Sequence, residues 1–261
     1  MAARRKTWLG VALVLLVGVP LLLDGQGRFR GEQGGMDQLP NVDYDGRFTF
    51  VRIRYGGGDP GFGFGRGRGG STWSHDYPRA EINFTKILGE LSTVQTRDDG
   101  TAVLTLDDPA LFNFPVAYLT EPGHWVPSEP EIVGFRNYVL KGGFMILDDF
   151  DGRDWINMEE QMRRVLPEAR LQLIPNAHPV FDSFYRIDNF DGYIHPYSQA
   201  QSEFWGVFED NDPTKRLMVA ICYQADIAEY WEFSDQGYFP IDLSNESYKL
   251  GVNYMVYALT R

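Results

Sequence analysis

Cysteine is nearly absent from this chain of 261 residues, which contains Cys222 alone. A single thiol cannot form a disulfide bond within the chain, so a folded domain must be held together by packing. Cys222 ends the apolar run 217–222, and we interpret it as a small buried hydrophobic residue. A catalytic thiol needs a lowered pKa, whereas the nearby carboxylates of Asp226 and Glu229 would raise it. The sequence therefore disfavours thiol catalysis.

Positive charge and histidine are also scarce. The chain has 24 Lys and Arg against 36 Asp and Glu, a net charge of −12, and 4 histidines. This balance excludes nucleic acid as a partner of the folded domain, because nucleic acids bind basic surfaces. No HExxH or comparably tight spacing of metal ligands occurs, so a metal site would have to be assembled from distant loops. From motifs alone we expect neither a metal nor a cofactor.

A long apolar run occurs at the N-terminus, where the basic segment 4–6 precedes the uncharged residues 7–23. This is the pattern of an export signal, and the run is at the short limit for a membrane-spanning helix. We expect residues 1–25 to be a signal peptide or membrane anchor, 26–46 a flexible linker and 47–261 the folded domain. The protein is then exported, either periplasmic or anchored through residues 7–23 in the cytoplasmic membrane and facing outward.

Strand patterns and helix patterns alternate along the rest of the chain. Expected strands cover 48–55, 94–96, 103–106, 115–120, 144–147, 171–174 and 217–222. Expected helices cover 78–91, a segment after the capping box 128–131, a segment capped by Asp154, and the segment from Ser244 or Asn245. The region 178–208 is rich in aromatic residues and gives no regular pattern. This alternation indicates the α/β class with a mostly parallel sheet.

The stretch 142–150 is the centre of the predicted sheet. Residues 144–147 are apolar without a polar break, as in a strand that is buried on both faces. Asp148 and Asp149 follow where this strand should stop, and ligands of open α/β sheets bind beyond the carboxyl ends of strands. Because neighbouring side chains on a strand start on opposite faces, we expect one carboxylate to point into a strand-end cleft and the other to cap the following segment.

Further candidate ligand-binding residues lie in loops that follow expected strands. They are His75, Asp76 and Tyr77 after the first strand, Glu121 after strand 115–120, His178, and Asp226 and Trp231 after strand 217–222. A structural role, such as helix capping or loop hydrogen bonding, is the alternative for each of these polar side chains. The glycine-rich stretch 56–70 lacks the spacing of a phosphate-binding loop, and we interpret it as a loop over a strand end.

Long motifs between Phe48 and Arg261 resemble an uncharacterised bacterial family, the domain of unknown function 4159. They include VRIRYGGG, WSHDYPRAEINF, FPVAYLTEPG, GGFMILDDF, RLMVAICYQADIAEYWE and YKLGVNYMVYAL. That family looks like a relative of the class I glutamine amidotransferase-like fold. The resemblance therefore implies a flavodoxin-like, three-layer α/β/α sandwich, and it supplies no reaction.

The resemblance also tests a mechanism. Amidotransferases place a nucleophilic cysteine on the turn after a strand that is led by two glycines, whereas this chain has Asp148 and Asp149 there. A carboxylate cannot replace a thiolate in that reaction, so standard glutaminase activity is not expected.

Three functional hypotheses from different classes follow. The first is a non-catalytic domain of the cell envelope that lacks the Cys-His-Glu triad and binds a small molecule or a protein in the strand-end cleft. The second is a hydrolase, possibly metal-assisted, that uses Asp148 or Asp149 with His75 or His178. The third is a structural or assembly subunit held at the membrane. We favour the first, so we do not expect an enzyme.

Overall fold

The fold was examined in a computed structural model that describes residues 41–56 and 72–261. The predicted leader, residues 26–40 of the predicted linker and residues 57–70 of the glycine-rich stretch lie outside the described residues. The strands are β1 (Val51–Ile53), β2 (Ala102–Leu104), β3 (Val116–Thr120), β4 (Phe144–Phe150), β5 (Gln172–Leu173), β6 (Glu203–Phe208) and β7 (Leu217–Tyr223). The α-helices are α1 (Arg79–Leu91), α2 (Glu129–Leu140), α3 (Asp154–Val165), α4 (Ile227–Glu232) and α5 (Ile241–Thr260).

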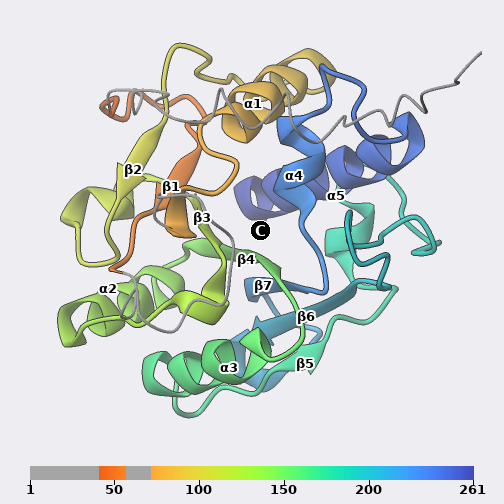
Figure 1. The fold of residues 1–261 in the computed structure, drawn as a ribbon. Coiled ribbons are helices and arrows are strands. Elements are labelled where there is room, and N and C mark those ends of the chain that lie inside the picture. The colour runs from red at the N-terminus through yellow and green to blue at the C-terminus, as the bar shows by residue number, and fades with distance from the viewer. Residues whose placement is uncertain (1–40, 57–71) are drawn as a thin grey trace, which may run out of the picture. The chain divides into compact units, whose positions relative to one another are not determined.

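The strands form one sheet in the order β2-β1-β3-β4-β7-β6-β5 (Figure 1). The pairs from β2 across to β7 are parallel, and β6 runs antiparallel to both of its neighbours. The predicted α/β class with a mostly parallel sheet is therefore confirmed. β3, β4 and β7 lie in the middle of the sheet and are buried almost throughout, as their unbroken apolar sequences predict.

Buried side chains form two clusters because successive strand residues point to opposite faces of the sheet. Phe144 and Ile146 of β4 belong to one cluster, whereas Met145 and Leu147 belong to the other. Helices α1, α4 and α5 pack on the face of the first cluster, and α2 and α3 pack on the face of the second (Figure 1). The sheet is thus covered by helices on both faces.

Most element predictions agree with the structure, including α1 and the capping box of α2 at Ser128 and Glu131. Several details differ. Residues 94–96 form only an isolated bridge, α5 begins at Ile241, the region without a pattern contains β6, and the loop predicted after Asp226 contains α4. Asp154 is the first residue of α3 and not its cap, because Arg153 holds the N-cap position.

The edge of the sheet formed by β2 is covered by residues that the sequence assigns to a linker. The Asn41 side chain donates a hydrogen bond to Val103 O at 2.8 Å and accepts one from Val103 N at 2.7 Å. Val42 N donates to Thr101 O at 3.2 Å. The domain therefore includes residues 41–46, which run beside β2. Within the described ranges, no helix combines the length and the apolar character needed to cross a membrane.

Candidate functional site

The candidate site lies where β1, β3, β4 and β7 end, four strands that are neighbours in the sheet. The chain leaves β1 for β2 on one side and later returns to β3 on the other side, so β1 and β3 flank a switch point in strand order. The first connection contains α1 and the next one between parallel neighbours, β3 to β4, contains α2, and these helices lie on opposite faces. A crevice at such a point is where doubly wound sheets bind ligands.

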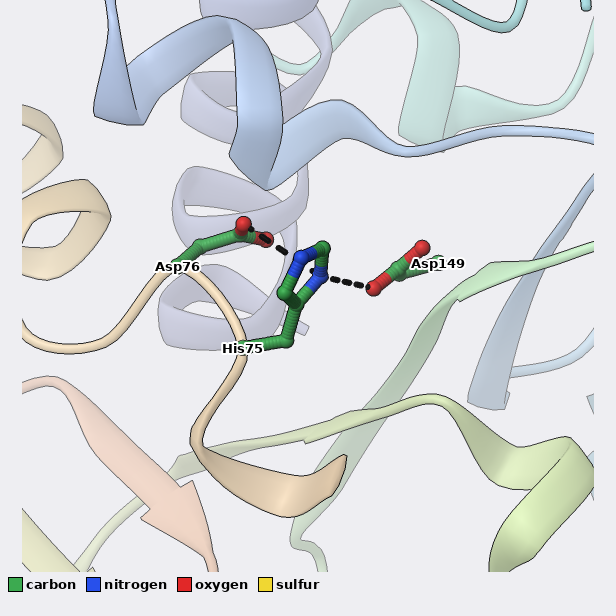
Figure 2. A group of neighbouring side chains, drawn as sticks. All are labelled: His75, Asp76 and Asp149. Carbon is green, nitrogen blue, oxygen red and sulfur yellow. Dashed lines mark hydrogen bonds and ion pairs between the residues drawn. The ribbon is translucent and has the colours of Figure 1, made fainter. Parts of the chain in front are cut away.

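His75 is at the centre of a group of carboxylates (Figure 2). Its Nδ1 is 2.6 Å from Asp149 Oδ2, 3.4 Å from Asp76 Oδ1 and 3.8 Å from Glu121 Oε1. A carboxylate can only accept at this distance, so Nδ1 carries a proton and donates it to Asp149. The loop before α1 and the ends of β3 and β4 therefore meet at one imidazole.

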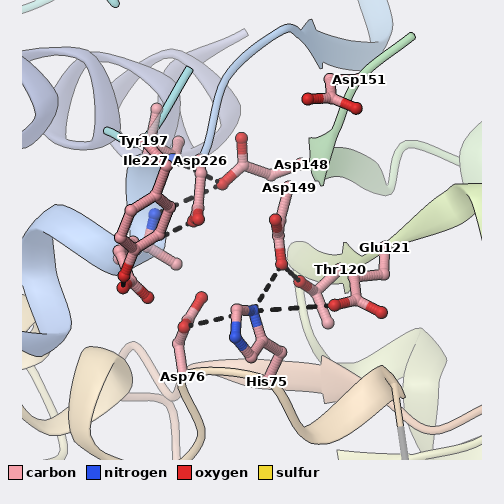
Figure 3. A network of polar contacts seen from close by, with 12 residues as sticks. His75, Asp76, Thr120, Glu121, Asp148, Asp149, Asp151, Tyr197, Asp226 and Ile227 are labelled. Carbon is pink, nitrogen blue, oxygen red and sulfur yellow. Dashed lines mark hydrogen bonds and ion pairs between the residues drawn. The ribbon is translucent and has the colours of Figure 1, made fainter. Parts of the chain in front are cut away.

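The short helix α4 brings further carboxylates to the same group (Figure 3). Asp226 is the N-cap of α4 and accepts a hydrogen bond from Glu229 N at 3.1 Å. Glu229 and Glu232 follow at intervals of three residues, which places all three carboxylates on one side of the helix. All three are buried, and the Tyr197 hydroxyl donates to Glu229 Oε1.

Three overlapping groups have the spacing of metal ligands, with one potential ligand atom per residue within 4.8 Å of the others. They are His75–Asp76–Asp149, His75–Asp226–Glu229 and Asp76–Glu229–Glu232. Imidazole nitrogen and carboxylate oxygen are both ligands of divalent metal ions in proteins. These are the described residues that could hold a metal.

Several carboxyl groups are buried close together in the site, and their burial and mutual charge shift their pKa values. The charge of Asp76, together with the hydrogen bond to Asp149, raises the pKa of His75 to about 12, although burial opposes the charged form. Burial also favours the neutral form of Asp149, but the hydrogen bond and charge of His75 outweigh it and lower the pKa of that carboxyl. Burial and the charge of Asp76 raise the pKa of Glu229 to about 10. Burial, followed by the charge of Asp149, raises the pKa of Asp226 well above its usual range.

Asp76 is the least satisfied member of the group. Its side chain is 0% exposed, and neither oxygen receives a hydrogen bond from the described residues. Its polar neighbours include the His75 ring and the carboxyls of Asp149, Glu229 and Glu232. Two carboxyl groups that face each other away from water are stabilised by a shared proton or by a cation.

Several residues at the strand ends have a left-handed backbone conformation. Asp76, Glu121, Asp149 and Gln224 have φ values of 63°, 47°, 62° and 53°. The left-handed region costs about 1–3 kcal/mol for a residue other than glycine, and such residues concentrate at functional sites. The concentration of these φ values at one edge of the sheet supports a functional role for this edge.

Asp148 and Asp149 have different roles, as their opposite starting directions predict. Asp148 is fully buried, and its Oδ2 accepts hydrogen bonds from the Tyr118 hydroxyl, from Ile227 N at 2.8 Å and from Ala228 N at 3.3 Å. It therefore caps α4, a helix that follows β7, and not the segment directly after β4. Burial raises the pKa of Asp148 to about 7.

Three of the predicted site residues lie away from the group. His178 packs between the rings of Phe208 and Tyr257, and the Tyr257 hydroxyl accepts a hydrogen bond from Leu217 N at the start of β7. His178 is thus near the amino end of β7, whereas the carboxylates lie beyond its carboxyl end.

Trp231 and Tyr77 also belong to packed regions. Trp231 is 0% exposed, with its ring centroid 4.4 Å from that of Phe84. A Cβ atom on Gly251 would lie 2.5 Å from the Trp231 ring, so this glycine in α5 is what admits the indole. The Tyr77 hydroxyl is 3.0 Å from Thr101 Oγ1, on the β2 side of the domain.

Sequence reasoning omitted Glu229, Glu232 and Tyr197 from the site. The spacing Asp226, Glu229, Glu232 was a usable signal, because residues three apart share one side of a helix. That signal requires a helix at 227–232, and the sequence predicted a loop there. No local pattern indicates Tyr197, since its partner Glu229 is 32 residues away in the chain.

Comparisons with known proteins add a family and no activity. A family described as a domain of unknown function, DUF4159, matches residues 49–259. The search of curated proteins finds no match.

Proposed function

This chain belongs to the DUF4159 family, and we propose that its domain is a non-catalytic binding domain that takes up a positively charged ligand at the strand-end site. One observation carries the proposal. Four carboxylates, those of Asp76, Asp149, Asp226 and Glu229, surround a single imidazole, and the buried Asp76 oxygens accept no hydrogen bond from the described residues. A bound cation would supply the charge that His75 supplies only in part.

The positions of possible nucleophiles support binding without covalent catalysis. Cys222 is 0% exposed, its Sγ is 3.6 Å from the Tyr254 hydroxyl, and burial raises the pKa of the thiol well above its usual range. A thiol in these surroundings is unreactive. The turn that holds the nucleophile in amidotransferases holds Asp148 and Asp149 here, and Asp148 is committed to α4.

A metal-assisted hydrolase is the second candidate, and the hydrogen bond from His75 to Asp149 favours it. A carboxylate that orients an imidazole is the arrangement found in general-base catalysis. In this version the histidine would be His75, because His178 lies near the amino ends of the strands.

The proposal also includes a fold type and a cellular location. The fold would be a flavodoxin-like, three-layer α/β/α sandwich of the class I glutamine amidotransferase-like type, which helices on both faces of the sheet support. The basic segment 4–6 and the apolar residues 7–23 support export, with the domain outside the cytoplasmic membrane.

The test is ligand-dependent thermal stability of the purified full chain. The probes are ZnCl₂, MnCl₂, spermidine and glucosamine as cations, with glucose and phosphate as neutral and anionic controls. We expect at least one cation to raise the melting temperature by several degrees, since a ligand of the native state stabilises it. Glucose and phosphate should leave it unchanged.

The variants Asp149→Asn and His75→Ala test whether the cation binds at the strand-end site. Both should keep the circular dichroism spectrum of the wild type and lose most of the cation-dependent shift. If no cation stabilises the wild type, or if both variants respond as the wild type does, the proposed function is wrong. Release of ammonia from glutamine by the wild type would contradict its non-catalytic character.

A further inference from the structure

We propose that the ligand of this site is a divalent first-row transition metal ion, such as Zn²⁺ or Mn²⁺, bound by His75, Asp76, Asp226 and Glu229. The inference rests on the proposed cation-binding function and narrows it to one class of cation. The four ligands come from two separate parts of the chain, the loop before α1 and the start of α4.

The geometry brings these four residues to one point. His75, Asp226 and Glu229 each offer an atom within 4.8 Å of the other two, and Asp76 has the same relation to Glu229 and, in another group, to His75. Ligands that bind one ion at about 2.0–2.2 Å are separated from one another by roughly 3–4.5 Å. Small side-chain movements would therefore complete a four-coordinate site.

His75 is oriented as a metal-binding histidine is. Its Nδ1–H donates to Asp149 at 2.6 Å, which fixes the ring and leaves Nε2 as the atom for a ligand. Metal-binding histidines usually donate their second N–H to a carboxylate or a carbonyl, and this contact holds the ring and makes the other nitrogen more basic. Asp149 is thus a positioning residue and not a ligand in this site.

Asp76 gives an independent indication of a missing positive group. It is fully buried and faces the site, and within residues 41–56 and 72–261 its oxygens receive no hydrogen bond from an N–H or hydroxyl group; their partners are the His75 ring and the Glu229 carboxyl. Buried carboxylates in native proteins generally accept several hydrogen bonds, so a carboxylate that has only the His75 ring and the Glu229 carboxyl as partners points to a ligand. A metal ion can bind both carboxylates at once.

The mixed ligand set favours a transition metal over Mg²⁺ or Ca²⁺. Magnesium and calcium ions prefer oxygen ligands alone, whereas imidazole nitrogen suits zinc and similar ions. One imidazole with three carboxylates therefore predicts an affinity order of Zn²⁺ above Mn²⁺ and Mn²⁺ above Mg²⁺.

The experiment is calorimetric titration of the full chain after treatment with EDTA and dialysis. ZnCl₂, MnCl₂ and MgCl₂ are titrated separately. We expect one ion per chain, with Zn²⁺ bound at least tenfold more tightly than Mg²⁺. Absorption by bound Co²⁺ gives a second readout, because the visible bands of a four-coordinate site are strong and depend on the ligands.

Single substitutions distinguish the proposed metal ligands from residues that lie near the metal without binding it. Glu229→Gln and Asp226→Asn should abolish binding and change the Co²⁺ spectrum, whereas Asp149→Asn should weaken binding about 10–100-fold without changing the number of ions. Asp151→Asn is the matched control: this carboxylate lies beside the group in Figure 3, is 51% exposed and belongs to none of the three metal-like groups. It should bind the metal as the wild type does.

Two results would overturn the metal assignment. In the first, the wild type binds none of the three ions, and the thermal shifts with spermidine or glucosamine then decide whether the broader cation-binding function survives. In the second, a metal binds equally well to Glu229→Gln, Asp226→Asn and the wild type, so the ion is held elsewhere. Melting of each variant without metal checks its fold, and since Gln and Asn keep the size of the side chain and an acceptor oxygen for Tyr197 and Glu229 N, neither should lower the melting temperature much.

Discussion

At the scale of single residues, the domain contains a second charged arrangement that is fully buried. Arg52 of β1 and Glu81 of α1 are each 0% exposed, and Arg52 Nε donates to Glu81 Oε1 at 2.6 Å. The guanidinium also lies 4.9 Å from the centre of the Tyr118 ring. Tyr118 in turn donates a hydrogen bond to Asp148, so the Arg52–Glu81 ion pair is connected through Tyr118 to a residue next to the candidate site.

Removal of one partner from this ion pair should be costly. We expect Glu81→Ala to lower the free energy of unfolding by about 3–5 kcal/mol, because Arg52 would remain charged, buried and unpaired. The double variant Arg52→Met with Glu81→Leu should be closer to the wild type than Glu81→Ala is. Urea unfolding of the three variants gives the comparison. A loss below about 1 kcal/mol in Glu81→Ala would show that water reaches the guanidinium.

At the scale of elements, the site depends on the placement of α4. This helix has only six residues, Ile227–Glu232, which is too short to be stable alone. It is held by Asp148 at its first N–H groups and by Trp231 in the core. Asn83 of α1 also donates to Trp231 O at 2.9 Å. Tertiary contacts therefore determine both the helix and the direction of Glu229.

Truncation of Asp148 should release α4. Asp148→Ala leaves the N–H groups of Ile227 and Ala228 and the hydroxyl of Tyr118 without their acceptor, at an expected cost of about 2–4 kcal/mol. Asp148→Asn keeps an oxygen in place and should cost less. Urea unfolding and amide hydrogen exchange at residues 227 and 228 measure the two effects. Equal stability of Asp148→Ala and the wild type would contradict this role for Asp148.

At the scale of the whole molecule, residues 41–43 are attached to the sheet. Asn41 and Val42 are hydrogen-bonded to residues beside and within β2. Arg97 also donates to Asp43 O at 2.6 Å. An unprotected edge strand tends to pair with other chains, so these residues protect the end of the sheet.

Two shortened chains test this attachment. A chain that begins at residue 47 loses three hydrogen bonds of Asn41 and Val42, each worth about 0.5–1.5 kcal/mol, and exposes one edge of β2. We expect it to melt at a lower temperature than a chain that begins at residue 38, and to self-associate in size-exclusion chromatography. The same melting temperature and a monomer for both chains would place the boundary at 47.

The class of the fold and the general position of the candidate site could be predicted from the amino-acid sequence. Unbroken apolar runs such as 144–147 and 217–222 identify buried parallel strands, and polar residues after them mark one edge of the sheet. These are local signals, because an apolar run and the polar residues that follow it are neighbours in the chain. His75, Asp76, Glu121, Asp149 and Asp226 were found in this way.

Which polar side chains face one another could be learned only from the folded chain. In the fold, Asp148 points towards α4 and Asp149 points towards His75. His178 lies near the amino ends of the strands. Glu229 joins the site from α4, a helix that is stabilised by its tertiary contacts. The physical reason is that a carboxylate on the surface and one in a buried group look the same in a sequence. Contacts between distant segments determine its burial, and burial beside other charges is what makes this edge a candidate cation site.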